Sequence, residues 1–262
     1  MKKKVGILID STQVSKQIHD LVQLSLKSNN YEITTLIVNN IDKNDENMIS
    51  QIFSYINRRG LLKFLSASVF KIICKIESLV LKRLDKFSTF YDNYELFENQ
   101  YEVINVNPLV SKSGFQYRYE KSDIKKIKNA KLELLIRAGV GILKGEILTV
   151  CPNGIISFHH ADNDINRGGP PGFWEVYENN PRTGFIIQRL KEELDGGDVL
   201  YKGFVATSWY YSLNLAKLYE ISNPFFHSVI DDITSGKPSP SVKKKSPYSF
   251  PLYSTPSVSQ SL

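Results

Sequence analysis

Two short apolar runs, separated by a segment with helical spacing, limit the fold of the first forty residues. Lys4 to Asp10 is a compact apolar strand, and Tyr31 to Val38 is a second one. Four apolar residues between them recur at helical intervals: Val14, Ile18, Leu21 and Val22. Ser11 or Thr12 can cap this helix. Because two strands joined by one helix form a parallel, right-handed crossover, the sequence predicts an open α/β sheet.

Sheets of this kind bind ligands beyond the carboxyl ends of their strands. Asp10 to Gln13 follows the first strand and so lies at such an end. It contains no glycine fingerprint, so the sequence does not imply a dinucleotide. The start of a helix can still accept an anion or a ligand carbonyl. Ser11 and Thr12 are therefore candidate substrate-binding residues, with an ordinary capped turn as the alternative.

The composition limits the size, partners and compartment of the protein. At 262 residues the chain suits one sizeable α/β domain with small additions. Its net charge of +6 supports only a modest preference for anionic partners, because part of the excess lies in runs at Lys2–Lys4 and Lys243–Lys245. It has two distant cysteines and an initial apolar run too short for a signal peptide. We therefore expect a cytoplasmic protein without a transmembrane segment.

From Met48 to Leu84 the chain has helical spacing and carries basic residues, which indicates a helical insertion over about 48–90. One side of the projected helix is apolar: Leu65, Val69, Ile72, Ile76 and Leu79. Lys71, Lys75 and Lys82 lie on another side, and such frequent charges exclude a membrane span. We expect the apolar side to pack on the core, with contact to a membrane surface as the alternative.

The remaining segments continue the α/β pattern. The elements expected are strands at Tyr101–Val106 and Leu132–Ala138, a polar helix at Asp123–Lys131, a loop at Phe87–Gln100, and a helix at Ser212–Thr234 interrupted at Pro224. The second of these strands runs into the segment GVGIL, Gly139–Leu143. Its glycines let backbone groups approach a flat ligand closely, and Ile142 and Leu143 can form an apolar wall.

A histidine and a distant aspartate indicate proton-transfer chemistry. Gly154 to His159 is a predicted strand, on which Ser157 and His159 share a face while His160 points the other way. Asp195 follows 36 residues after His159 in the turn LDGGD, and it can orient the imidazole and stabilise its cation. The predicted chemistry is acyl transfer.

The segment HHADND offers a rival interpretation as a metal site. Its possible ligands are His159, His160, Asp162 and Asp164. Adjacent histidines on a strand diverge, however, and neither a cysteine cluster nor an HExxH pattern accompanies them. We therefore expect no bound metal.

Four short motifs resemble the formyltransferases that use 10-formyltetrahydrofolate, a family that includes glycinamide ribonucleotide, methionyl-tRNA and nucleotide-linked amino-sugar formyltransferases. The matching positions are Ser157–His159 for a strand ending in Asn-x-His, Arg167–Gly168 in the loop, Thr183–Gly184 at a strand start, and Leu194–Gly197 for the Leu-Asp-Gly turn. The resemblance implies a Rossmann-like open parallel sheet of the formyltransferase type over 1–236. Residues 237–262 are rich in Pro, Ser and Lys, which indicates an extended strap or a partly disordered tail.

The same resemblance implies roles for individual residues. His159 and Asp195 would be the catalytic pair, and Ser157 stands where the family has a catalytic asparagine. Its hydroxyl, or an amide from Asn153, Asn163 or Asn166, would then stabilise the oxyanion. The pterin would lie against a set of backbone and apolar positions: Gly139, Val140, Gly141, Ile142, Leu143, Leu190, Glu193 and Leu194. The co-substrate is 10-formyltetrahydrofolate, no metal takes part, and a non-catalytic folate- or nucleotide-binding relative is the alternative.

The acceptor is expected to be a small primary amine, and the preferred candidate is a nucleotide-linked amino sugar for surface polysaccharide. The candidate substrate-binding residues are Ser11, Thr12, Arg167, Gly168 and Trp174. Aromatic clusters at Phe173–Tyr177 and Trp209–Tyr211 can stack on a base or sugar, or pack in the core. Only 59 residues follow Gly203, too few for the barrel domain of the methionyl-tRNA enzymes, so a nucleic-acid partner is not favoured. Those enzymes and the purine-pathway enzymes remain alternatives, and the oligomeric state is open.

Overall fold

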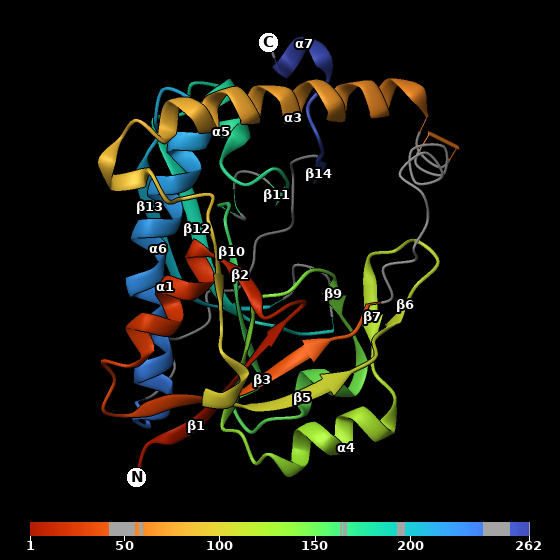
Figure 1. Cartoon of the computed structure of the whole chain (residues 1–262), viewed down its shortest axis with the longest axis vertical. Helices are drawn as coiled ribbons and strands as arrows, with labels where there is room; N and C mark the ends of the chain where they lie inside the picture. Colours follow the sequence, from red (N-terminus) through yellow and green to blue (C-terminus); the bar gives the residue numbers. More distant parts are fainter. Residues whose placement is uncertain are drawn as a thin grey trace.

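A seven-stranded sheet forms the centre of the protein, in the order β13-β12-β10-β8-β1-β3-β5 (Figure 1). The structure is a computed structural model and describes residues 1–41, 56–57, 60–162, 164, 167–192, 197–237 and 252–261. The strands of the sheet are β1 (Lys3–Ile9), β3 (Tyr31–Asn39), β5 (Glu102–Val106), β8 (Leu134–Arg137), β10 (Ile155–His159), β12 (Arg182–Arg189) and β13 (Asp198–Ala206). Strands β5, β3, β1, β8 and β10 run parallel, whereas β12 and β13 are antiparallel to their neighbours. The predicted open parallel α/β sheet is thus confirmed, with an antiparallel end that the sequence did not indicate.

Helices cover both faces of the sheet because its central strands are apolar on both sides. Alternate residues of β1 enter different cores: Val5, Ile7 and Ile9 face α1 (Lys16–Ser25) and α6 (Tyr211–Thr234), while Leu8 faces α4 (Lys121–Asn129). Figure 1 shows α1 and α6 side by side on one face, with α4 on the other. This arrangement leaves the carboxyl ends of the parallel strands clear for a site.

Shorter elements surround this sheet. They are β2 (Gln13–Ser15) paired with β4 (Asn93–Glu95), the small sheet of β6 (Leu109–Val110), β7 (Gln116–Arg118) and β9 (Ile142–Leu143), the helices η1 (Asp85–Phe87), η2 (Glu98–Gln100), η3 (Gly145–Thr149) and α5 (Phe173–Tyr177), and the elements α3, β11, β14 and α7 described below.

The first helix starts later than its apolar spacing predicts. Val14 lies in β2, which pairs with β4, and Ser15 rather than Ser11 or Thr12 occupies the N-cap position of α1. Ser11 instead accepts a hydrogen bond from the Gln13 backbone N–H at 3.1 Å. The cross-strand pairing to β4, from a segment expected to be a loop, has overridden the local helical spacing.

Helix α6 is continuous, so the predicted interruption at Pro224 is wrong. Pro224 lies inside the helix and cannot donate an N–H to the preceding turn. The helix is held on both sides of it: Asn223 Nδ2 donates to the Gln17 carbonyl at 2.9 Å, and Phe226 and Ile230 are fully buried. Packing against α1 and the sheet compensates for the missing hydrogen bond.

Helix α3 (Leu61–Leu81) is rotated about its axis so that the side expected to face the core faces outward. Of the five residues predicted to pack on the core, Val69 is partly buried, and the other four are exposed: Leu65, Ile72, Ile76 and Leu79. The buried side carries Glu77, whose carboxylate accepts the backbone N–H of Tyr211 at 3.3 Å and of Ser212 at 2.7 Å. This carboxylate satisfies free donors at the start of α6, which sets the rotation of α3. Among the described residues, no helix is long and apolar enough to span a membrane.

The described end of the chain forms a strap. β14 (Leu252–Tyr253) pairs in parallel with β11 (Arg167–Gly168), and α7 (Val258–Ser261) packs against α3. Gly168 has a φ of +101°, and a Cβ built there would lie 2.0 Å from the Tyr253 carbonyl oxygen. Only glycine therefore allows this pairing.

We expect Gly168→Ala to loosen the strap and destabilise the protein. The matched control is Gly236→Ala, since Gly236 also has a positive φ, +80°, but open space around its Cβ position. The control should lose about 1–2 kcal/mol for its backbone conformation, and Gly168→Ala a further ~1–3 kcal/mol for the steric clash. Thermal unfolding and limited proteolysis measure both effects. Equal losses in the two variants would contradict the assigned role of Tyr253.

Candidate active site

Two cavities meet at the carboxyl ends of β8 and β10. The first, of about 200 Å³, we call the His159 cleft, and its lining is Arg137, Gly141, Ile142, Leu143, Ser157, Phe158, His159, Gln188, Leu190, Lys191 and Gly197. The second, of about 230 Å³, we call the His160 cleft, and its lining is Gln17, Ile18, Leu21, Ile136, Arg137, Ala138, Gly139, Ser157, Phe158, His160 and Tyr219. Arg137, Ser157 and Phe158 line both, so they form the junction of the two clefts.

The sheet register builds this junction. Ser157 on β10 is the direct partner of Arg137 on β8 and of Gln188 on β12. The three side chains therefore come from one row across neighbouring strands. Ser157 is 2% exposed, and its hydroxyl donates to the Phe158 carbonyl at 3.0 Å. A ligand in either cleft would lie next to this row.

The two histidines serve different clefts, as the strand alternation predicts. His159 lines the first cleft and His160 the second. His160 stacks on Phe158 with ring centroids 4.9 Å apart, and its Nε2 lies 3.2 Å from Gln17 Nε2 and 3.3 Å from Ser222 Oγ. Burial, with a smaller effect of His159, lowers the pKa of His160 to about 3. His160 is thus a neutral hydrogen-bonding group at physiological pH.

The acidic residues of HHADND do not converge with these histidines. Asp162 and Asp164 both pair with Lys202, at 2.5 Å and 2.7 Å. Within the described part of the chain, no three His, Cys, Asp or Glu side chains are grouped as metal ligands. Both carboxylates are thus bound to the Lys202 ammonium group rather than grouped with the histidines.

A polar network that the sequence analysis missed supports the junction. Asp10, at the end of β1, accepts a hydrogen bond from Asn39 Nδ2 at 2.8 Å and from the Val140 backbone N–H at 2.6 Å. Tyr119 donates to Asn39 Oδ1 at 2.8 Å, and Arg137 donates to the Gly141 carbonyl. Burial lowers the pKa of Arg137, and the charge of Asp10 opposes that shift, so the guanidinium stays charged. The sequence does contain one signal for this network, because Arg137 is a lone arginine in the largely apolar run LELLIRAG.

The two glycines of GVGIL make room for protein groups. A Cβ on Gly139 would lie 2.8 Å from Asp10 Oδ1, and one on Gly141 would lie 2.7 Å from the Tyr117 ring. Gly141 also has a φ of +83°. The glycines therefore allow the segment to fold tightly over Asp10 and Tyr117, with its apolar end facing the His159 cleft.

The structure brings together only some of the predicted pterin-contacting residues. Gly141, Ile142, Leu143 and Leu190 line the His159 cleft, whereas Gly139 lines the His160 cleft. Val140 is exposed and lines neither. Glu193, Leu194 and the catalytic candidate Asp195 lie outside the described residues, as do Asn163 and Asn166. Asn153, the other proposed amide donor, binds Glu133 at 2.7 Å and lines neither cleft.

Four of the five predicted substrate-binding residues do not line the cavities described here. Ser11, Thr12, Gly168 and Trp174 line neither of the two clefts, nor the third cavity described below. Trp174 is buried, donates its indole N–H to the Gly169 carbonyl at 3.2 Å, and packs on Tyr253. The side chain of Arg167 lies outside the described atoms. Trp174 is thus packed in the core, which was the alternative to substrate binding.

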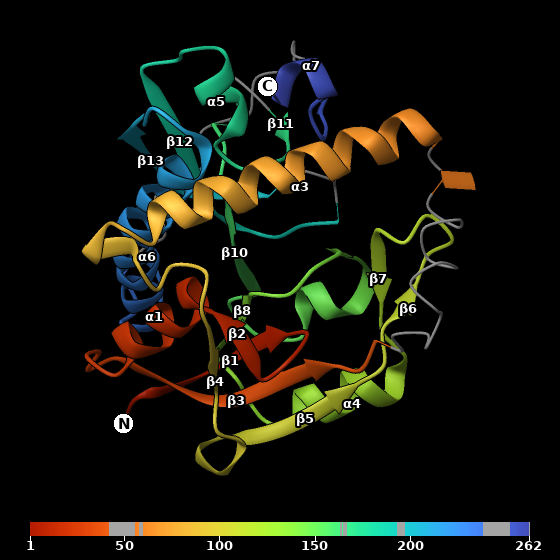
Figure 2. The ribbon, with the colours of Figure 1, turned by 45° about the horizontal axis from the view of Figure 1, so that its top comes forward.

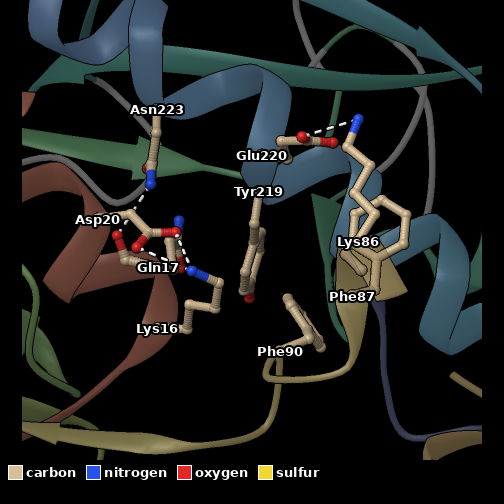
Figure 3. Close-up of a pocket in the computed structure, with 10 residues that line it drawn as sticks. Lys16, Gln17, Asp20, Lys86, Phe87, Phe90, Tyr219, Glu220 and Asn223 are labelled. Atoms are coloured by element: carbon tan, nitrogen blue, oxygen red, sulfur yellow. Dashed lines mark hydrogen bonds and ion pairs between the residues drawn. The ribbon is translucent and has the colours of Figure 1, made fainter. Parts of the chain in front are cut away.

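A third cavity continues the series (Figure 3). This lysine pocket has a volume of about 150 Å³ and is lined by Lys16, Gln17, Asp20, Lys86, Phe87, Phe90, Ala216, Tyr219, Glu220 and Asn223. Gln17 and Tyr219 also line the His160 cleft. Lys16 pairs with Asp20 at 2.9 Å and Lys86 with Glu220 at 2.8 Å. Its residues come from three separate segments, 16–20, 86–90 and 216–223, so no local sequence motif predicts the pocket.

Comparisons with known proteins point to the formyltransferases. No model of a known protein family matches the sequence. The methionyl-tRNA formyltransferases of Bacillus thuringiensis (strain Al Hakam) and Bacillus mycoides (strain KBAB4) are each 33% identical over 82 residues, which is 31% of this chain and 26% of theirs. The match thus spans about a quarter of the length of these relatives.

Solved structures resemble the chain over most of its length. Glycinamide ribonucleotide transformylase 1 from Symbiobacterium toebii has a TM-score of 0.55 at 12% identity, covering 90% of this chain and 89% of that one. A sugar N-formyltransferase from Shewanella sp FDAARGOS_354 has 0.52 at 16%, with 94% and 76% covered. A formyltetrahydrofolate deformylase from Pseudomonas syringae pv. tomato str. DC3000 has 0.52 at 11%, with 90% and 62% covered. The chain therefore has the fold of the formyltransferases, and over 82 residues it is related to them in sequence.

Proposed function

We propose that the protein transfers a formyl group from 10-formyltetrahydrofolate to a primary amine. The observation that carries this proposal is the meeting of two clefts at Ser157, with His159 in one of them. A transfer reaction needs two substrates that approach one point from different sides. The junction at Arg137, Ser157 and Phe158 supplies such a point.

The His159 cleft suits the folate. Ile142, Leu143 and Leu190 give it an apolar wall for a flat pterin ring. Gln188 lies at its polar side, and its Oε1 is buried and accepts no hydrogen bond from the described residues. A buried acceptor of this kind is stabilised by an N–H donor, which the edge of a pterin offers.

The reaction would use groups at the junction. The amine nitrogen attacks the formyl carbon, the bond from that carbon to the folate nitrogen breaks, and a proton passes from the amine to the leaving nitrogen. His159 would carry this proton, and Asp195, if it lies as the family resemblance implies, would orient the imidazole. The Ser157 hydroxyl and the Arg137 charge would stabilise the oxyanion. No step requires a metal.

The amine would enter through the His160 cleft. From there Gln17 and Tyr219 lead into the lysine pocket, where the rings of Phe87 and Phe90 and the ammonium groups of two lysines lie. The aromatic faces suit a base, and the two lysines would bind phosphates on exchanging their carboxylate partners for them. This supports a nucleotide-linked amino sugar, in line with the sugar N-formyltransferase among the structural neighbours. Methionyl-tRNA, a purine precursor, or water, as in the deformylase, are the other acceptors to test.

Binding of the folate tests the first half of the proposal. We expect calorimetry to detect binding of 5-formyltetrahydrofolate, with an affinity that a chelator leaves unchanged. Leu190→Ser should weaken binding by about tenfold or more, because it removes apolar contact from the cleft wall. The control Leu109→Ser alters an exposed leucine on β6 and should bind normally. Absence of binding, or binding lost on chelation, would refute the assignment of the cleft.

The role of His159 is tested by His159→Asn. We expect formyl transfer to fall by about 100- to 10,000-fold while folate binding and the unfolding temperature stay near native values, because proton transfer alone is lost. His19→Asn is the control, since His19 lies on α1 and lines none of the three cavities described above. Near-native turnover in His159→Asn would remove His159 from the mechanism.

Ser157 distinguishes an enzyme from a binding protein. If its hydroxyl stabilises the oxyanion, Ser157→Ala should lower kcat by about ten- to a thousandfold with little change in folate affinity. Ser157→Asn, which restores the family's residue, should preserve or raise kcat. A native protein that binds folate but transfers to no amine, while Ser157→Asn gains transfer, would replace the enzyme proposal with that of a binding module.

A further inference from the structure

The outward side of α3 carries an exposed apolar stripe. Leu62, Leu65, Ile72, Ile76 and Leu79 are between 44% and 80% exposed. At 3.6 residues per turn they fall within a sector roughly 100° wide. Figure 2 shows α3 running across the outside of the described molecule, and the contact with α7 leaves these side chains exposed.

The opposite side of α3 is already occupied, so the stripe does not belong to the core. Leu81 is fully buried, Phe70 packs edge-on against Phe173 at 5.3 Å, and Glu77 accepts the N–H groups at the start of α6. Rotating the helix to bury the stripe would break all of these contacts. The outward apolar side of α3 is therefore part of the protein surface and not of the core.

The charges beside the stripe are of one sign. Lys71, Lys75 and Lys82 are exposed and lie along one flank, with Arg83 following them. Glu77 is the single acidic residue between 60 and 84, and it points inward to the α6 backbone. An apolar stripe with a cationic flank is complementary to an anionic, partly apolar partner.

An exposed tryptophan precedes α6, on the inward side of α3. Trp209 is 96% exposed and stands two residues before Tyr211, whose ring lies 5.4 Å from that of Phe70 on α3. Indole rings prefer the boundary between lipid headgroups and acyl chains. Because Trp209 is exposed, its fluorescence tests whether it also reaches the bilayer.

We propose that α3 binds the surface of an anionic lipid bilayer, with its apolar stripe in the interface and its lysines at the headgroups. Self-association through α3 fits the surface less well, because it would bring the cationic flanks of two copies together. The proposal does not depend on the catalytic one. It also reverses the preference drawn from sequence, which assigned this apolar side to the core.

Flotation of the full-length protein with vesicles tests the proposal. We expect it to bind vesicles of mixed phosphatidylglycerol and phosphatidylcholine but not vesicles of phosphatidylcholine alone. The double variant Ile72→Ser, Ile76→Ser should lose at least about tenfold in binding. Each of Lys71→Gln and Lys75→Gln should lose about fivefold. Since these side chains are exposed, all variants should keep the native unfolding temperature.

Two controls sharpen the measurement. Leu109→Ser removes an exposed apolar residue from β6 and should bind vesicles as the native protein does. A blue shift of tryptophan emission on vesicle addition, lost in Trp209→Phe, should report the contact of Trp209. The proposal fails if the native protein does not bind anionic vesicles, or if the double variant Ile72→Ser, Ile76→Ser binds them equally well. It also fails if light scattering shows a dimer that this variant abolishes.

Discussion

The candidate site depends on the hydrogen bonds of one partly buried carboxylate, that of Asp10. It stands at the end of β1 and binds Asn39, at the end of β3, and the backbone of Val140, in the segment that follows β8. Three neighbouring parts of the sheet edge are thereby joined through one side chain. A carboxylate that is partly removed from water is stabilised when its oxygens accept hydrogen bonds. The hydrogen bond from the Val140 N–H to Asp10 holds the segment Gly139–Leu143 in place, and the end of that segment forms a wall of the His159 cleft.

Helix α6 connects the site to the outer surface. Its first turn is bound by Glu77 of α3, and its middle supplies Tyr219 and Ser222 to the environment of His160. Asn223 fixes it to α1. One long helix, continuous through Pro224, thus forms walls of two cavities and also sets the rotation of α3. The acceptor side of the site and the proposed lipid-binding surface share this support.

The candidate site could be predicted only where its residues are close in sequence. The pattern around Ser157 and His159, and the apolar end of GVGIL, pointed to positions that do line one cleft. Gln188 and Lys86 could not be found in this way, because they reach their cavities through strand register and through packing of distant segments. Ser11 was predicted from its place after a strand end and Trp174 from an aromatic cluster; in the fold, Ser11 accepts the Gln13 N–H and Trp174 donates to the Gly169 carbonyl.

The sequence by itself determined the strands of the parallel sheet, since each apolar run must be buried on both faces, and it determined the divergence of His159 and His160, which follows from strand alternation. Tertiary structure decided what local periodicity leaves open. Helix α3 is apolar on more than one side, so its spacing could not say which side packs inward. The contacts of its inward side made that choice together: Glu77 accepts the N–H groups at the start of α6, Phe70 packs on Phe173, and Leu81 is buried.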